Sequence, residues 1–303
     1  MLTVARAARD IESMRVRGAG KIARHAVAAL RDVAATHEGS EGRLARELQR
    51  SARRLVATRP TAVSLRNAVE EATAPLARHN GSLRADVLAA SERFLDRSLR
   101  AVEVISTAGA KLLDGDGVVL THCNSACSVG VIATAARRHR LEAIATETRP
   151  RRQGHLTATQ LRARGVPVTL IVDGAVNLAM REVDWVVVGA DTIARNGDVV
   201  NKVGTSLVAL SAREHGVPFY VAAETYKVDR RARTGEQVAI EERAAREVLE
   251  GRRLPGVRVA NPVFDVTPAR LVTRIVTEVG TVPPSGLAPL LARSSRRRRA
   301  GSA

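Results

Sequence analysis

The chain has 303 residues, of which 45% are apolar and 26% are charged. This balance is typical of a globular protein, and the length allows about two domains whose cores need no disulfide or metal. Only 2% of the residues are aromatic, which leaves too few rings for the stacking surface that binds single-stranded nucleic acid. The formal net charge of +17 indicates an anionic partner, and we expect a phosphorylated metabolite rather than nucleic acid.

The beginning of the chain and its cysteines favour a cytoplasmic protein without a membrane partner. Asp10 and Glu12 interrupt the first residues, which lack the apolar stretch of a signal peptide. No run approaches the roughly 18 apolar residues of a membrane span. Cys123 and Cys127 are the two cysteines, and one such short segment provides no disulfide framework. Their C-x3-C spacing lacks the further Cys or His residues of a tetrahedral site, so we expect no metal.

Residues 1–107 are predicted to form an all-helical domain. Ala, Leu, Arg and Glu dominate this stretch, and strand-like runs of Val and Ile are absent from it. Apolar residues recur at helical spacing in 26–34 and again in 87–99. The breaks between these stretches indicate about four or five helices.

Two basic segments of this helical domain are candidates for contact with an anion. Arg17-Gly18-Ala19-Gly20 superficially fits a dinucleotide-binding motif, but no strand precedes it and no βαβ unit surrounds it, so we reject that function. The alternative is a Gly-rich helix start whose amides contact a phosphate together with Arg17. Arg59-Pro60 marks a second basic helix start. For each segment an ordinary solvated surface is the competing interpretation.

From residue 108 to 285 short apolar runs alternate with helical stretches. The expected strands are 117–122, 141–146, 168–172, 185–189 and 217–222. Strands that alternate with helices form a parallel sheet whose carboxyl ends lie along one edge. We therefore predict an α/β fold in which the N-terminal all-helical domain is followed by a Rossmann-like parallel-sheet domain. Residues 286–303 are rich in Arg, Ser and Ala, and we expect a disordered Arg-rich tail there.

Each predicted strand ends in polar or ionisable residues, which is typical of an active-site crevice. Cys123 precedes a helix whose N-terminal amides favour a thiolate, although a small buried hydrophobe is an equally good interpretation. Asp191 follows a buried strand, where desolvation raises the pKa of a carboxyl toward that of a useful acid; a helix or turn cap is the alternative. Residues 201–206 open another helix with a Lys, a Gly and hydroxyls, which can hold a phosphate.

Several of these segments together resemble one known family. They are Arg17–Gly20, 121–125, 146–150, 188–191, 201–205, 223–227 and 261–268. In order and spacing they are similar to the family that unites the regulatory subunits of translation initiation factor 2B with sugar-phosphate isomerases, over about residues 10 to 284. The resemblance implies the same two-domain fold and a homo-oligomer, either a dimer or a hexamer.

Within this family the sequence is most similar to the branch that converts ribose 1,5-bisphosphate to ribulose 1,5-bisphosphate in AMP metabolism and nucleotide salvage. The resemblance implies that Cys123 is the proton acceptor and Asp191 the proton donor. The substrate contacts that it implies are Arg17, Gly18, Ala19, Gly20, Arg59, Ser125, Ala126, Cys127, Asn201, Lys202 and Lys227. Cys127 departs from the small residue expected at its position, which concerns the local packing rather than the assignment.

The implied chemistry needs few groups. A sugar with a phosphate on O1 cannot open its ring unaided, so an acid must protonate the ring oxygen and a base must remove the proton from C2. This reaction uses no metal and no redox cofactor. Two alternatives stay open: an isomerase for a singly phosphorylated sugar such as methylthioribose 1-phosphate, and a non-catalytic nucleotide-sensing subunit that binds an initiation factor. The presence of both Cys123 and Asp191 favours an enzyme.

Overall fold

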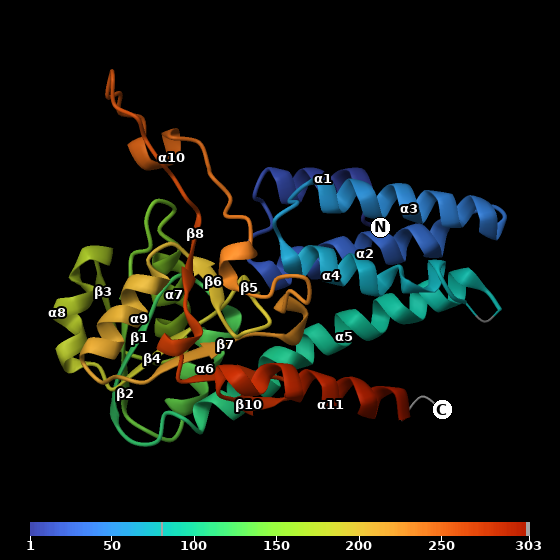
Figure 1. Ribbon diagram of the computed structural model, residues 1–303. Helices are drawn as coiled ribbons and strands as arrows, with labels where there is room; N and C mark the ends of the chain where they lie inside the picture. The colour runs from blue at the N-terminus through green and yellow to red at the C-terminus, as the bar shows by residue number, and fades with distance from the viewer. Residues whose placement is uncertain (80, 301–303) are drawn as a thin grey trace. The chain divides into compact units, whose positions relative to one another are not determined.

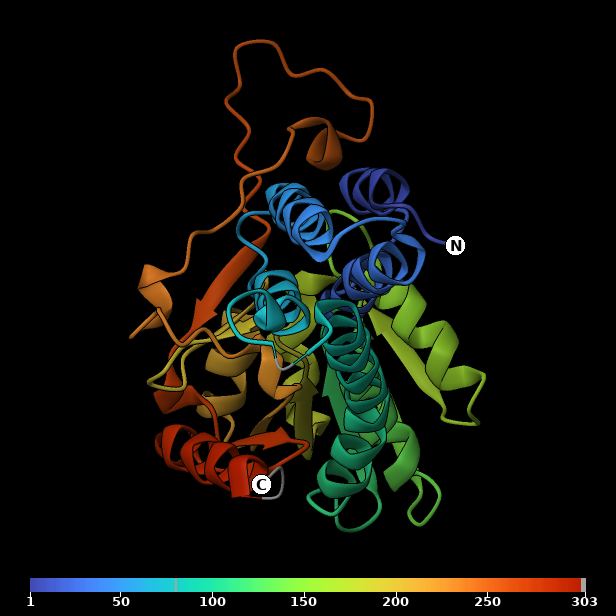
Figure 2. The same cartoon turned by 90° about the vertical axis from the view of Figure 1, so that its right-hand side faces the viewer.

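The computed structural model describes residues 1–79 and 81–300 (Figures 1 and 2). The chain divides into two compact units, Met1–Ala101 and Val102–Ala303. The division falls inside the long helix α5 (Leu83–Ala110), so one helix contributes residues to both units. The predicted fold class is confirmed, because a helical N-terminal region is followed by a mostly parallel sheet.

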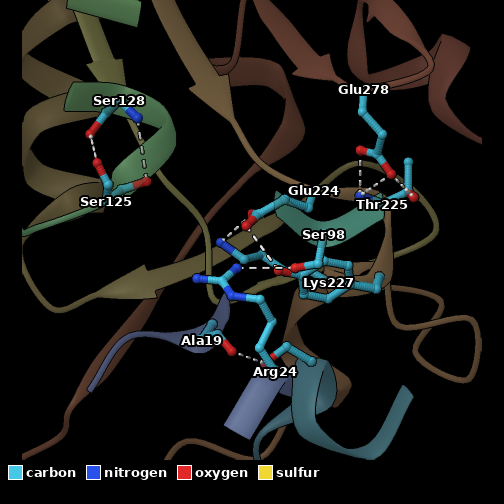
Figure 3. Close-up of polar contacts among 11 residues, drawn as sticks. Ala19, Arg24, Ser98, Ser125, Ser128, Glu224, Thr225, Lys227 and Glu278 are labelled. Atoms are coloured by element: carbon cyan, nitrogen blue, oxygen red, sulfur yellow. Dashed lines mark hydrogen bonds and ion pairs between the residues drawn. The ribbon is translucent and has the colours of Figure 1, made fainter. Parts of the chain in front are cut away.

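The first unit is built from helices. Besides the beginning of α5 it contains α1 (Val4–Glu12), α2 (Ala19–Thr36), α3 (Glu41–Ala57) and α4 (Val63–Ala72). Small side chains such as Ala23, Ala26 and Ala68 are fully buried, which lets α2 pack closely against α4. Arg24 of α2 donates a hydrogen bond of 3.1 Å to the Ser98 hydroxyl of α5 (Figure 3).

The second unit contains a seven-stranded sheet in the order β10-β9-β7-β4-β1-β2-β3. Its strands are β1 (Gly117–Thr121), β2 (Leu141–Thr146), β3 (Val168–Ile171), β4 (Trp185–Val188), β7 (Phe219–Ala222), β9 (Arg274–Thr277) and β10 (Gly280–Val282). Every pairing from β3 to β9 is parallel, and only β10 runs antiparallel to its neighbour. The strands β1 and β4 are direct neighbours, so the residues that follow them emerge side by side at the carboxyl edge.

Helices connect these strands and cover the core of the sheet. They are α6 (Ala126–Ala135), α7 (Gln153–Arg162), α8 (Val176–Ala179) and α9 (Thr205–Glu214). Apolar residues of the central strands, among them Leu120, Val186 and Val221, are fully buried in one cluster with Val208 of α9. Such buried Val and Leu runs are typical of a parallel sheet that is covered on both faces.

A small antiparallel sheet, which the sequence did not predict, lies at the end of β4. It consists of β5 (Thr192–Ile193), β6 (Val199–Lys202) and β8 (Phe264–Thr267) in that order. The turn between β5 and β6 contains Gly197 with a φ of 89°, a conformation that glycine adopts without strain. The last residue of β6 is Lys202, so this small sheet places that side chain.

The segment from 239 to 262 projects from the second unit and carries the short helix α10 (Arg246–Leu249) (Figures 1 and 2). Its ends are side by side, because the Val263 N–H donates to Glu241 O at 2.9 Å. Ion pairs connect it to the loop after β2. These are Arg149 with Glu250, Arg151 with Glu247, and Arg152 with Glu250.

The expected disordered tail is wrong for the residues that the structure describes. Helix α11 (Leu287–Ala300) covers most of it, and residues 301–303 lie outside the described residues. Leu287 is fully buried and Leu291 packs against the main core cluster. These apolar contacts stabilise a helix whose sequence is otherwise typical of a solvated segment. Among the described helices, none combines the length and apolar character that crossing a membrane requires.

Candidate active site

Cys123 lies directly after β1 in a left-handed backbone conformation, with a φ of 68°. Cys123 as a residue is half-buried, whereas Cys127 is buried. The Cys123 N–H donates to the Thr148 hydroxyl at 2.9 Å, and its carbonyl accepts from the Thr157 hydroxyl at 2.7 Å. The loop that carries Thr148 is itself fixed, because its N–H donates to the Asp173 carboxylate at 2.8 Å. The ends of β1, β2 and β3 therefore meet at Cys123.

The electrostatic surroundings of Cys123 favour the neutral thiol. Burial raises the pKa of Cys123 to about 11, and the negative charges of Asp191 and Asp173 act in the same direction. Lys202 and the Asn124 amide oppose this effect without outweighing it. The following helix was expected to favour a thiolate, but desolvation is the larger influence and raises the pKa of Cys123.

Asp191 follows β4, the strand next to β1. Its N–H donates to Val200 O at 3.0 Å, which attaches this residue to β6 of the small sheet. The side chain is half-buried, and its charge influences the pKa of Cys123. The structure therefore brings together the thiol and the carboxylate that the sequence singles out, each at the end of a neighbouring strand.

Lys202 and Asn201 occupy the end of β6 and are both buried. The Lys202 ammonium lies 4.9 Å from the centre of the Phe264 ring, within the range of a cation–π contact. Because Lys202 lowers the pKa of Cys123, its positive charge acts directly on the thiol. The Asn201 amide donates to the Thr205 hydroxyl at 3.0 Å.

The start of α9 differs from the predicted phosphate site. The Gly204 N–H donates to Asp265 at 2.7 Å, and the Ser206 hydroxyl donates to the same carboxylate at 2.8 Å. The Thr205 hydroxyl donates to Lys202 O at 2.6 Å. Asp265 thus caps this helix with the negative charge that a phosphate would otherwise supply. Burial raises the pKa of Asp265 despite these hydrogen bonds.

Lys227 belongs to a second buried group, which Figure 3 shows. It lies in the short turn after β7, and its ammonium is 2.7 Å from the Glu224 carboxylate. Burial by itself would raise the pKa of Glu224 and lower that of Lys227, but their mutual attraction outweighs it, so the pKa of Glu224 is lowered and that of Lys227 raised. The Tyr226 hydroxyl donates to Glu224 at 2.9 Å. Lys227 is therefore a charge that the protein itself compensates.

Ser125, Ala126 and Cys127 form the beginning of α6. Ser125 is the N-cap and its hydroxyl accepts from the Ser128 N–H at 3.4 Å (Figure 3). Cys127 is buried, and burial together with the Glu224 charge raises its pKa well above the ordinary value. Gly189 permits this arrangement, since a Cβ there would lie 2.5 Å from the Ser125 side chain. The first-turn amides of α6 lack intrahelical acceptors, as at any helix start.

In the first unit the two predicted basic helix starts meet at one residue. The Arg17 guanidinium donates to Met14 O at 2.8 Å, and the Arg59 guanidinium lies 3.9 Å from the Met14 sulfur. Gly18, with a φ of 87°, is the N-cap of α2, and the Ser64 hydroxyl of α4 donates to Ala19 O at 3.4 Å. The basic residues that precede α2 and α4 therefore gather at Met14 in this unit.

Sequence reasoning did not assign roles to three residues that hold Cys123. Thr148 and Thr157 form hydrogen bonds to the Cys123 backbone, and Asp173 accepts a hydrogen bond from the Thr148 N–H. Thr148 and Asp173 follow predicted strands, which was the available signal, whereas Thr157 is an interior residue of α7. Within the described ranges, no group of three or more His, Cys, Asp and Glu side chains is arranged to hold a metal.

Residues 15–284 match the Initiation factor 2 subunit family. The chain belongs to this family. Among its relatives in the Initiation factor 2 subunit family is the ribose 1,5-bisphosphate isomerase of Archaeoglobus fulgidus, which is 46% identical over 94% of this chain and 91% of its own length. The resemblance inferred from the motifs is therefore confirmed.

Solved structures in the family include two different kinds of protein. The 5-methylthioribose 1-phosphate isomerase of Pyrococcus horikoshii OT3 is 33% identical, with a TM-score of 0.82 over 96% of this chain and 87% of that one. The translation initiation factor eIF-2B of the same organism is 32% identical, with a TM-score of 0.81 over 93% and 97% of the two chains. The curated relatives are named as sugar-phosphate isomerases, which supports the prediction that this chain is an enzyme.

Proposed function

We propose that this protein is an isomerase that converts ribose 1,5-bisphosphate to ribulose 1,5-bisphosphate, as a step of AMP metabolism and nucleotide salvage. The observation that carries the proposal is the pair of Cys123 and Asp191 on neighbouring strand ends, close enough for the carboxylate to influence the thiol pKa. The 46% identity to a ribose 1,5-bisphosphate isomerase supports the choice of substrate. The protein would act as a homo-oligomer, either a dimer or a hexamer.

In the proposed reaction Asp191 is the acid that acts on the ring oxygen, and Cys123 is the base that acts on C2. Asp191 gives a proton to the ring oxygen, and the bond between that oxygen and C1 breaks. The Cys123 sulfur takes the proton from C2, and the electron pair of the C2–H bond forms the C1=C2 double bond of an enol phosphate. The Cys123 thiol then returns its proton to C1 and Asp191 takes the proton from the C2 hydroxyl, which gives the ketose and restores both residues. General acid and base catalysis of this kind contributes about 10²- to 10⁴-fold each.

The positive groups would bind the two phosphates. In the second unit these are Lys202 and the first-turn amides of α6. The resemblance to the family implies that Asn201 and Lys227 also contact the substrate. In the first unit Arg17 and Arg59 are the corresponding charges. Lys202 has a second role in the proposal, since its charge stabilises the thiolate that must form at Cys123.

One observation favours a second candidate, an isomerase for methylthioribose 1-phosphate. Lys227 is compensated by Glu224, which reduces the positive charge that a second phosphate would meet. The similarity to the 5-methylthioribose 1-phosphate isomerase of Pyrococcus horikoshii OT3 supports this candidate. The two functions differ in the number of phosphates that the site must bind.

The test is to incubate the full-length protein with ribose 1,5-bisphosphate and, separately, with methylthioribose 1-phosphate, at fixed ionic strength because salt screens these contacts. The ketose product is detected in each case. Higher kcat/KM for the bisphosphate supports the first function, and higher kcat/KM for the monophosphate supports the second. If neither substrate is converted, the non-catalytic subunit becomes the better account of the protein.

A further inference from the structure

The backbone at the end of β1 adopts a conformation that non-glycine residues seldom occupy. Cys123 has a φ of 68°, and Thr148, its hydrogen-bond partner, has a φ of 63°. Left-handed conformations of this kind persist only where the surrounding structure holds them, and they concentrate at functional sites. The groups that hold Cys123 therefore determine where its sulfur points.

Both polar groups of the Cys123 residue backbone are held by threonine hydroxyls. The N–H donates to Thr148 Oγ1 at 2.9 Å, and the carbonyl accepts from Thr157 Oγ1 at 2.7 Å. Thr148 and Thr157 are both fully buried. A buried hydroxyl can rotate to suit its partners, so its direction here follows from the next group in the chain of hydrogen bonds.

Behind Thr148 the chain continues through buried side chains. Its hydroxyl donates toward Thr146, whose Oγ1 lies 3.1 Å away and whose carbonyl oxygen lies 3.3 Å away. Thr146 Oγ1 is 2.6 Å from His122 Nδ1, and His122 Nε2 is 2.9 Å from Val203 O. Thr146 is fully buried and His122 nearly so. The chain thus runs from the amide of Cys123 to the residue that follows Lys202.

The last acceptor fixes the direction of every bond. A carbonyl oxygen only accepts, so His122 Nε2 must carry the hydrogen and Nδ1 must accept from the Thr146 hydroxyl. Thr146 then accepts from Thr148, and Thr148 accepts from the Cys123 N–H. Burial lowers the pKa of His122 although Asp173 opposes this, which keeps the ring neutral with a single N–H. A Cβ at Gly204 would lie 2.9 Å from the ring, so that glycine leaves space for it.

We propose that Thr148, backed by Thr146 and His122, is a positioning residue that aims the Cys123 sulfur at the reacting carbon. The inference rests on the proposed isomerase function. Val203 directly follows Lys202. The same chain of hydrogen bonds therefore also fixes the position of Cys123 relative to Lys202, a cation that would bind phosphate. Loss of the Thr148 hydroxyl leaves the Cys123 thiol present but no longer held at the end of β1.

The first arm of the test compares Thr148→Val with Thr148→Ser. The two variants differ in the hydroxyl that accepts from Cys123, and valine keeps the shape of threonine. We expect Thr148→Val to lower kcat about 10-fold with KM changed less than about 2-fold, because misplacement of a reacting group costs rate rather than binding. Thr148→Ser should restore most of kcat. Thr159→Val is the matched control, since the exposed Thr159 hydroxyl donates only to His155 O within the same helix.

The second arm uses no substrate and measures the amide of Cys123 itself. The chain has two cysteines, so ¹⁵N-cysteine labelling gives two amide signals, and Cys127→Ser assigns them. Exchange of the Cys123 amide with solvent should be about 10-fold faster in Thr148→Val than in the wild type or Thr148→Ser, while the Cys127 signal serves as the internal reference. Thermal unfolding of each variant confirms that the measurements are made on folded protein.

The outcomes separate this inference from the proposed function. Unchanged amide exchange in Thr148→Val, or an equal loss of kcat in the valine and serine variants, overturns the positioning role. A wild-type protein that converts neither sugar phosphate overturns the proposed function instead. In that case fast exchange in Thr148→Val still supports the hold on Cys123, and slow exchange contradicts it.

Discussion

Two groups in the second unit consist of the same residue types, one cysteine, one acid and one lysine, yet their environments differ. In the first, the charges of Asp191 and Lys202 act on the pKa of Cys123, and this half-buried cysteine has a left-handed backbone conformation. In the second, Lys227 and Glu224 form a buried ion pair. Cys127, the cysteine of that second group, is buried beside Glu224.

The difference teaches which group is suited to react. Charges that compensate each other inside the protein stabilise a fixed arrangement, and breaking them is costly because one charge is left buried alone. The charges of Lys202 and Asp191 instead act on a thiol at the carboxyl edge of the parallel sheet, which is where such folds bind their ligands. We therefore expect substitutions in the Cys123 group to change the rate, and substitutions in the Lys227 group to change stability first.

The largest effect should separate the two cysteines. Cys123→Ser keeps the shape but replaces the thiol with a hydroxyl that hardly ionises, so kcat should fall at least about 10²-fold. Cys127→Ser should change kcat far less, because Cys127 is buried in the compensated group. Steady-state kinetics on ribose 1,5-bisphosphate decide this. Equal losses in both variants would erase the distinction between the two groups.

Substitutions of the two acids should also differ, with Asp191 affecting the rate and Glu224 the stability. Asp191→Asn cannot deliver a proton, and we expect a loss of kcat of about 10²-fold or more with KM unchanged or lowered. Glu224→Gln leaves the buried Lys227 ammonium without its counter-charge, which should cost about 3–5 kcal/mol of unfolding free energy, or on the order of 10 °C in Tm. Kinetics and thermal unfolding of both variants check this. A stable Glu224→Gln protein with wild-type Tm would contradict it.

The lysines sharpen the comparison through specificity. Lys202→Met removes a cation assigned to phosphate, so kcat/KM for ribose 1,5-bisphosphate should fall about 10- to 150-fold, the equivalent of one charge-assisted contact of about 1.5–3 kcal/mol. Lys227→Met should instead lower Tm, because Glu224 is left buried and unpaired. If Lys227→Met is stable and loses only bisphosphate activity, Lys227 belongs with the reactive group after all.

The last prediction is the pH dependence of the residual activity of Asp191→Asn, in which Cys123 titrates without the acid. The pKa of Cys123 is raised to about 11, so at neutral pH only a small fraction is the thiolate that accepts the proton. In Asp191→Asn, where no acid titrates at this position, the thiolate fraction below that pKa, and with it the residual kcat/KM, should rise about 10-fold for each pH unit between about pH 7 and 9. A pH–rate profile in a buffer of constant ionic strength measures this slope. A rate that falls over this range would make Cys123 the proton donor.

Much of the sheet could be predicted from the sequence, since buried Val and Leu runs bounded by polar residues identify strands directly. The expected strands at 141–146 and 185–189 agree with β2 and β4 to within one residue. The small sheet was missed because β5 has two residues and β6 pairs with residues 264–267, far along the chain. Helix α11 was missed because its stability comes from burial of Leu287 against that distant core.

The sequence was enough to predict which residues belong to the site. It was not enough to predict which of these residues contact each other. Cys123 and Asp191 stood out because each follows a buried strand, and the parallel sheet brings such residues to one edge. That Lys227 meets Glu224, or that Asp265 caps α9, depends on how turns and distant strands pack. The direction of the Cys123 pKa shift was also missed, because the sequence reveals the nearby helix but not the extent of desolvation.

The projecting segment between 239 and 262 has a consequence for engineering the chain. Its two ends are already hydrogen-bonded to each other at Glu241 and Val263, so the body of the unit closes without it. The entropy of closing a loop grows only with the logarithm of its length, and a shorter or longer insert at this place would meet the same anchored ends. An affinity tag or a fluorescent reporter grafted there would leave β8 in register with β6, and it should spare Glu247 and Glu250, whose ion pairs tie the segment to the loop that carries Thr148.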